Sequence, residues 1–368
     1  MTSTGIPVNP SSLTWYMNDI GLSPDSLAKK AGISVSHLDK ILHGNNDPGV
    51  SFRQLNNIAS KLLTTTASLL IPPPRNPSLP EHVDFRRNKN EPLSYESNKQ
   101  LKQFLKARDN YLSLNNHEDS SSALLRQFHH RELSQRAAET RALLFGNKIK
   151  LSLTELSDAV ERYGILIFRV HGVPTSDFRG YSAYFDVAPI IVINNKDSEN
   201  GRKFTLLHEL AHLMNHTSGL CSISTNTEPM CNQFAALVLM PESSVMGCKE
   251  DNVDAWILKI SDKLGVSEHA AAIRLNDLGY ASRSDVAKAE QRSKDAWARR
   301  QKQQKTSDRP VPQWRQTLSH LGRRYTSTVL DALQSGRIDE LDASYMLDTR
   351  VPSLEKLQTH LGYDEGGY

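Results

Sequence analysis

The chain has 368 residues, of which 38% are hydrophobic and 23% are charged, and its formal net charge is +3. This length predicts two or three domains, and the ordinary apolar fraction excludes a disordered or fibrous chain. Three cysteines exclude a disulfide framework, and no apolar run is typical of a membrane span or a secretory signal. We therefore expect a cytoplasmic protein that does not contact a membrane. The small positive charge neither requires nor excludes nucleic acid.

The first part of the chain, residues 11–70, predicts a series of short helices. Ser23 and Pro24 are typical of a helix start, and Gly32 is typical of a helix end. Ser34 then caps a second helix that runs to His43. Two short helices joined by a tight glycine turn predict a helix-turn-helix.

This stretch resembles a phage-repressor-like (XRE-type) helix-turn-helix domain. The positions that carry the resemblance are Leu27, Ala28, Gly32, Ile33, Ser34, Leu38, Ile41, Leu42, His43, Gly44, Leu55, Ile58, Ala59 and Leu62. The resemblance implies that the second helix enters the major groove of operator DNA. The expected DNA contacts are Ser36, His37 and Lys40 at base edges, and Lys29 and Arg53 at phosphates. Because the basic density is modest and Asp39 would repel phosphate, a protein partner or a homodimer interface stays open as the alternative.

Residues 76–145 are expected to form a proline-containing linker followed by helices. Prolines at 72–74, 77 and 80 end the first module. Between residues 97 and 145, apolar side chains recur at helical spacing with a break near 115–122, which predicts two helices.

Three apolar stretches, at residues 164–168, 181–185 and 189–194, then predict a small antiparallel sheet. The β-branched block 188–195 is the clearest strand, and we expect an extended substrate to pair with it by edge addition. A helix with apolar periodicity follows and contains the stretch from His208 to His212.

Two histidines four residues apart project from the same face of a helix. His208 and His212 therefore suit a Zn²⁺ ion, and Glu209 suits the general base beside it. A zinc hydrolase needs a third protein ligand, and Glu228, at the start of a second apolar helix, is our candidate. The alternatives are two satisfied histidines on an ordinary amphipathic helix and a carboxylate that merely favours a helix N-terminus. A His/His/Glu set also binds Mn²⁺, so Mn²⁺ is the second metal we consider.

The residues around these positions resemble the ImmA/IrrE family of metallo-endopeptidases. Within residues 150–280, the resemblance is carried by Phe204 to His212, Glu228, Asn232, Phe234 to Ala236, and Leu239 to Pro241. It implies a zincin-like fold in which His208, His212 and Glu228 bind zinc and Glu209 is the catalytic base. His216 is expected to lie outside the ligand set. The departures from the family pattern are Pro229, Met230 and Cys231.

The rest of the chain predicts only helices. Residues 283–305 form a cation-rich helical stretch, which we interpret as a solvated linker helix, with a phosphate-binding arm as the alternative. Apolar residues between Leu318 and Leu333 predict one helix, and a further helix starts at Asp339.

The sequence thus predicts an α+β, mostly helical chain of five parts. These parts are an XRE-type helix-turn-helix domain (1–75), a linker with helices (76–145), a zincin-like metallopeptidase domain with a small antiparallel sheet (146–282), a basic linker helix (283–310) and a small helical C-terminal domain (311–368).

The resemblance implies a zinc endopeptidase whose substrate is a transcriptional repressor or an antitoxin. Cleavage would relieve repression after a stress or phage signal. The alternative is a DNA-binding regulator or antitoxin whose peptidase-like domain acts as a sensor with little turnover.

Overall fold

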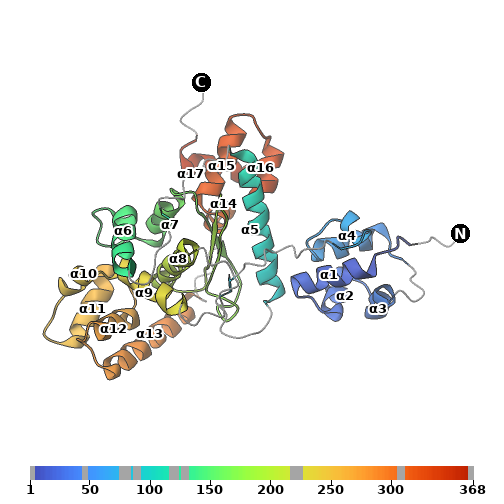
Figure 1. The fold of residues 1–368 in the computed structure, drawn as a ribbon. Coiled ribbons are helices and arrows are strands. Elements are labelled where there is room, and N and C mark those ends of the chain that lie inside the picture. The colour runs from blue at the N-terminus through green and yellow to red at the C-terminus, as the bar shows by residue number, and fades with distance from the viewer. Residues whose placement is uncertain are drawn as a thin grey trace. The chain divides into compact units, whose positions relative to one another are not determined.

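The computed structural model describes residues 5–43, 49–73, 84–85, 93–115, 124–125, 132–215, 227–304 and 311–363. The chain divides into two compact units (Figure 1). The N-terminal unit contains residues 1–81 and 87–105, and the C-terminal unit contains residues 82–86 and 106–368. Helix α5 (Tyr95–Leu114) therefore contributes residues to both units.

The N-terminal unit is a bundle of short helices. Its elements are α1 (Pro10–Ile20), α2 (Pro24–Ala31), α3 (Val35–His43), α4 (Phe52–Lys61) and the short 3-10 helix η1 (Ala67–Leu69). The side chain of Ser23 caps α2, and Gly32 ends it in the left-handed conformation with φ 70°. The two helices predicted on either side of Gly32 are therefore present. The apolar faces meet in one core that includes Leu13, Ile20, Leu27, Leu38, Ile41 and Ile58.

The C-terminal unit is built around a mixed sheet with the strand order β1-β3-β4-β2. The strands are β1 (Asp84–Phe85), β2 (Leu166–Val170), β3 (Gly180–Ala183) and β4 (Ile190–Asn194). Strand β4 is central, and it runs parallel to β2 and antiparallel to β3. Every residue of β4 is buried, because helices and neighbouring strands surround it.

The prediction of an antiparallel sheet was wrong for the pair β2 and β4. Strands that follow one another in sequence usually pair, but β2 and β3 are not neighbours. Residues 171–179 connect β2 to β3, which lies on the far side of β4. The sequence carried a signal for this arrangement, because a continuous apolar strand without polar alternation is typical of a strand covered on both faces, as in parallel sheets.

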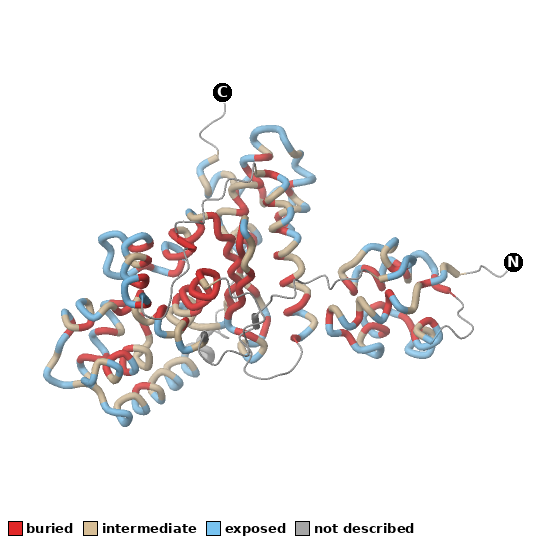
Figure 2. Tube along the Cα trace, in the orientation of Figure 1, coloured by how far each residue is buried: buried red, intermediate tan, exposed pale blue. Residues whose placement is uncertain are grey.

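Twelve helices lie between residues 132 and 363 of the described chain. The first six are α6 (Leu133–Phe145), α7 (Leu153–Glu161), α8 (Glu199–Met214), α9 (Thr227–Leu239), α10 (Glu242–Met246) and α11 (Val253–Leu264). The next six are α12 (Glu268–Asp277), α13 (Arg283–Gln304), α14 (Gln313–Leu321), α15 (Arg323–Gln334), α16 (Glu340–Met346) and α17 (Val351–Leu361). Helix α8 contacts β3, β4, α7 and α9 and is at the centre of this packing. Figure 2 shows buried residues gathered along α8 and the strands.

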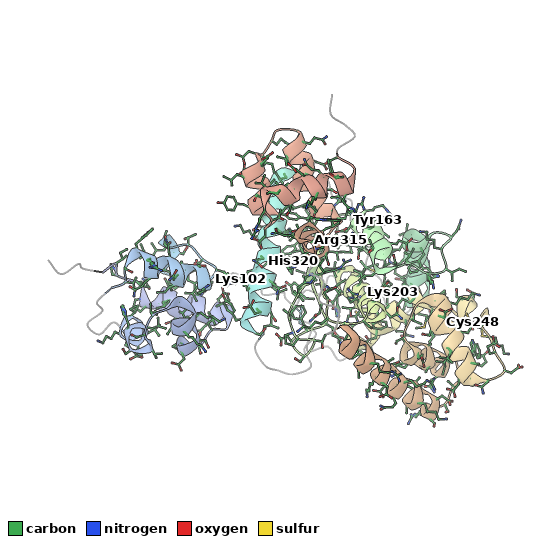
Figure 3. The ribbon with its side chains drawn as sticks, turned by 180° about the vertical axis from the view of Figure 1, so that it is seen from behind. Lys102, Tyr163, Lys203, Cys248, Arg315 and His320 are labelled. Atoms are coloured by element: carbon green, nitrogen blue, oxygen red, sulfur yellow. The ribbon has the colours of Figure 1, made fainter. Side chains whose placement is uncertain are left out.

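The last helices pack onto the sheet and onto α7. Helix α14 contacts β2, and α15 contacts both β2 and α7. His320 on α14 places its Nδ1 atom 2.6 Å from the carbonyl oxygen of Arg169 on β2 (Figure 3). The prediction of one helix between Leu318 and Leu333 was wrong, because Gly322 (φ 74°, ψ 166°) separates α14 from α15. That backbone conformation is essentially restricted to glycine.

The basic stretch of α13 is partly neutralised by ion pairs within the C-terminal unit. Arg292 bonds with Glu268 and Asp254, and Lys294 with Glu290. Ala289 on the same helix is fully buried, and α13 packs on α12. Among the described helices, none combines the length and the apolar character needed to cross a membrane.

Candidate metal centre

Helix α8 buries three of the predicted site's ionisable side chains in the core of the C-terminal unit. Ser198 caps its start by accepting a hydrogen bond from the backbone N–H of Gly201. Further along, His208, Glu209 and His212 are only 0%, 2% and 3% exposed. Ionisable groups are costly to bury unless they have partners, so their burial here points to specific neighbours.

Helix α9 supplies the fourth side chain, because it packs along α8 and begins close to the histidine pair. Glu228 lies in its first turn. The Nε2 atoms of His208 and His212 are 3.1 Å apart. Glu228 Oε1 lies 3.1 Å from Nε2 of His212, and Oε2 lies 3.3 Å from Nε2 of His208. Three potential ligand atoms thus lie within 4.8 Å of one another.

These separations fit a divalent metal ion. Ligand atoms at about 2.0–2.1 Å from a tetrahedral Zn²⁺ ion are about 3.3 Å from one another. The three measured distances, 3.1, 3.1 and 3.3 Å, are close to that value. Two imidazoles and a carboxylate are also the donor types that zinc hydrolases use while leaving a fourth position for water. His208, His212 and Glu228 are therefore chemically and geometrically suited to hold one metal ion.

The electrostatics of the cluster favour a positive charge among these three side chains. Hydrogen bonds with His208 and His212 hold the pKa of Glu228 well below its ordinary range, so this carboxylate stays ionised. Burial opposes the charged form of His212, yet its neighbours Cys231 and Glu228 raise the pKa of His212 well above its ordinary value. A metal ion would replace that proton, so metal binding is expected to release protons.

Glu209 points toward strand β3 and not toward solvent. The hydroxyl of Ser182 donates a hydrogen bond of 2.8 Å to Glu209 Oε2. A Cβ atom added at Gly180 would lie 2.6 Å from Glu209 Oε1, which shows how closely the carboxylate approaches the strand backbone. The sequence analysis missed both residues of β3. The available signal was the glycine in a strand, which often marks a close approach of another group.

Three of the residues predicted for the peptidase site, His208, His212 and Glu228, thus come together, and Glu209 directly follows the first of them. The predicted DNA contacts belong to the N-terminal unit. Ser36, Lys40, Lys29 and Arg53 are exposed there. His37 is half-buried, and its Nε2 atom lies 3.0 Å from the carbonyl oxygen of Gly49.

The cysteines and His216 are the remaining residues to be placed. Cys231 and Cys248 are buried free thiols. His216 and Cys221 lie outside the described residues.

The expectation that block 188–195 pairs with an extended substrate was wrong. Strand β4 is hydrogen-bonded to β2 on one side and to β3 on the other, so it offers no free edge. The strand next to it, β3, contacts α8 and pairs through Tyr181 and Ser182 with residues 85 and 84 of β1.

A polar cleft of about 450 Å³ begins next to β3. Its lining includes Arg179, which directly precedes β3, together with Ser198 at the start of α8 and Trp297 on α13. This volume is within the range of ligand pockets in proteins.

Comparison with known families agrees with this geometry. The family model of the IrrE N-terminal-like domain (Peptidase_M78) matches residues 160–276. This segment is a metallopeptidase-like domain. The matched residues contain the sheet strands β2 to β4, helices α8 and α9, and all four members of the site, His208, Glu209, His212 and Glu228. Searches of curated proteins and of solved structures give no match.

Proposed function

We propose that the metallopeptidase-like domain hydrolyses peptide bonds with one divalent metal ion, and that Zn²⁺ is that ion. The convergence of His208, His212 and Glu228 beside the buried carboxylate of Glu209 is the observation that carries this proposal. Mn²⁺ is the alternative metal, since the same donor set accepts it. When bound, the metal would polarise the scissile carbonyl and lower the pKa of water.

In this proposal Glu209 is first the general base and then the general acid. It accepts a proton from the attacking water, whose oxygen bonds to the carbonyl carbon, and it delivers that proton to the amine that leaves when the C–N bond breaks. His208, His212 and Glu228 act as ligands and keep their side chains aimed at one point.

We further propose that the substrate is a transcriptional repressor or an antitoxin. This choice rests on the resemblance of the residues around the site to the ImmA/IrrE family. Cleavage of the substrate would relieve repression after a stress or phage signal.

The test is cleavage of a candidate repressor by the Glu209→Gln variant of the full chain. We expect the variant to retain its metal and to lose nearly all cleavage. Glu161→Gln is the matched control, because Glu161 is also an almost fully buried carboxylate in the C-terminal unit but lies on α7. Unchanged cleavage by Glu209→Gln would defeat the assignment of the base.

We also propose that the N-terminal unit binds operator DNA. Support comes from the resemblance to XRE-type domains and from the exposed face of α3, which presents Ser36 and Lys40 to solvent. Lys29 and Arg53 on the neighbouring helices are exposed as well and would contact phosphates.

A further inference from the structure

Strand β3 touches Glu209 through two residues on the same face. Gly180 and Ser182 are two positions apart, so in a strand they face the same way. Ser182 is 1% exposed, and its hydroxyl donates the 2.8 Å hydrogen bond to Glu209 Oε2. One end of the carboxylate is thereby fixed to the strand.

Gly180 provides the room that this arrangement needs. A Cβ atom at position 180 would lie 2.6 Å from Oε1 and 3.0 Å from Cγ of Glu209. It would also lie 2.3 Å from Cγ2 of Thr205, one turn earlier on α8. Real Cβ atoms do not approach other atoms this closely, so any side chain at position 180 displaces Glu209, Thr205 or the strand.

The strand itself is held in place on both edges. Ser182 pairs with Ile191 of β4 on one side and with residue 84 of β1 on the other. A group carried by such a strand has a fixed position relative to α8, which packs against β3 and β4.

We infer that Gly180 and Ser182 form a seat that holds the Glu209 carboxylate in one conformation, and that Ser182 is a positioning residue for the base. The inference rests on the proposed function. A glutamate has several rotatable bonds and loses rotamer freedom when it is held, and a general base must stay within hydrogen-bond reach of the proton it takes. The seat provides that restraint before substrate binds.

The first test compares Ser182→Ala, Ser182→Thr and the wild-type full chain in cleavage of the candidate repressor. Because misplacing a catalytic group by about 1 Å can cost about 100-fold, we expect Ser182→Ala to lower kcat about 10- to 100-fold. KM and metal content should not change, because the metal ligands are intact and Ser182 is buried beneath Glu209. Ser182→Thr retains the hydroxyl and should recover most of the lost kcat.

The matched control is Ser157→Ala. Ser157 is also buried and hydrogen-bonded, because its hydroxyl accepts from Arg169, but it lies on α7. Its loss should leave kcat unchanged. If Ser182 only supported the fold, the folded and metal-loaded Ser182→Ala variant would keep the wild-type kcat, and that result would overturn the inference.

Gly180 is tested in a background that isolates its contact with Glu209. Thr205→Ser removes the Cγ2 atom that a new Cβ would meet, and Gly180→Ala is then added. The double variant should have a lower kcat than Thr205→Ser alone, with equal metal content. Equal kcat values for these two proteins would show that the space at Gly180 does not position the base.

A third measurement separates this inference from the proposed function. In the metal-free chain, Ser182→Ala and Glu209→Ala are combined, and the urea midpoints of the wild type, both single variants and the double variant are compared. We expect the double variant to lose less than the sum of the single losses, because both substitutions remove the same bond. Additive losses of stability would overturn the inference about the seat, even if the wild type cleaves its substrate. Non-additive losses of stability together with no cleavage by the wild type would support the seat and reject the proposed peptidase activity.

Discussion

Two buried carboxylates in the C-terminal unit, Glu209 and Glu161, have closely similar packing. They are 2% and 4% exposed. Each lies against a glycine, since an added Cβ would be 2.6 Å from Glu209 Oε1 at Gly180 and 2.5 Å from Glu161 Oε1 at Gly322. Neither burial nor close packing therefore distinguishes the two residues.

Their neighbours do distinguish them. Glu209 directly follows His208 on α8, and the ligand atoms of His208, His212 and Glu228 converge on one point. Glu161, on α7, lies against Gly322 at the start of α15. Burial raises its pKa, and the backbone N–H groups of Arg324 and Arg323 only partly oppose that shift. The comparison teaches that a buried carboxylate marks a catalytic site only when other donors converge beside it. Alone, it is a structural contact between helices.

The largest expected effect comes from removing the metal. A strong chelator should lower cleavage of the candidate repressor at least about 1000-fold, because both the polarised carbonyl and the activated water depend on the metal. Added Zn²⁺ should restore cleavage by the wild type but not by His212→Ala, which lacks a ligand. Glu161→Gln should respond to chelator and to zinc as the wild type does. Full cleavage in excess chelator would show that cleavage needs no metal ion. A neighbouring metal centre would then not distinguish Glu209 from Glu161.

The next effect concerns the glycine beside Glu161. Gly322→Ala adds a Cβ atom 2.4 Å from the carbonyl oxygen of Ile167. It also places an alanine at φ 74°, a backbone conformation that residues with a Cβ atom rarely adopt. We expect it to lower the free energy of unfolding by about 3 kcal/mol, the sum of backbone strain and overpacking. Gly336→Ala is the control, because Gly336 has φ 68° but no atom within 4 Å of its added Cβ. It should cost about 1 kcal/mol. Equal losses in urea unfolding would show that the close approach to Glu161 has no energetic role.

Glu161 also predicts a pH dependence of stability. Burial raises its pKa from 4.5 to about 8, although the N–H groups of Arg324 and Arg323 oppose the shift. Between these values the folded chain holds a proton that the unfolded chain has lost, so stability falls as pH rises. From pH 6 to pH 8 we expect a loss of about 2 kcal/mol from this group, and Glu161→Gln should remove it. If the free energy of unfolding, measured in urea, fell equally with pH in the variant and the wild type, Glu161 would not cause the pH dependence.

The smallest effect is expected in the N-terminal unit, where the candidate phosphate contacts Lys29 and Arg53 are exposed, unlike either carboxylate. Lys29→Ala should weaken binding to operator DNA by about 1 kcal/mol and reduce the slope of affinity against salt by about 1. Lys259→Ala is the control, because Lys259 is an exposed cation on α11 in the other unit. Cleavage should be unchanged in both variants. A gel-shift titration in which Lys29→Ala binds as the wild type does would reject a phosphate contact at this position.

The metal centre could be predicted from the sequence because its chemistry is local. His208, Glu209 and His212 lie within one helical turn, and Glu228 opens the next described helix, so two helix assignments place all four. Helix caps such as Ser23 and Ser198 likewise depend only on neighbouring residues.

What the sequence did not predict depends on distant contacts. The parallel pairing of β2 and β4 requires knowledge of where β3 lies, and the helix break at Gly322 reflects contact with β2 and α7. The bond from Ser182 to Glu209 joins residues 27 positions apart and has no motif of its own. Such contacts follow from packing, which local patterns do not encode.

The most direct test of the central claim is X-ray absorption at the zinc edge of the full chain loaded with one equivalent of Zn²⁺. We expect one tightly bound ion with nitrogen and oxygen ligands at about 2.0–2.1 Å, including two imidazoles, and loss of the ion in Glu228→Ala. A sulfur ligand at about 2.3 Å, or no bound zinc at this stoichiometry, would contradict it.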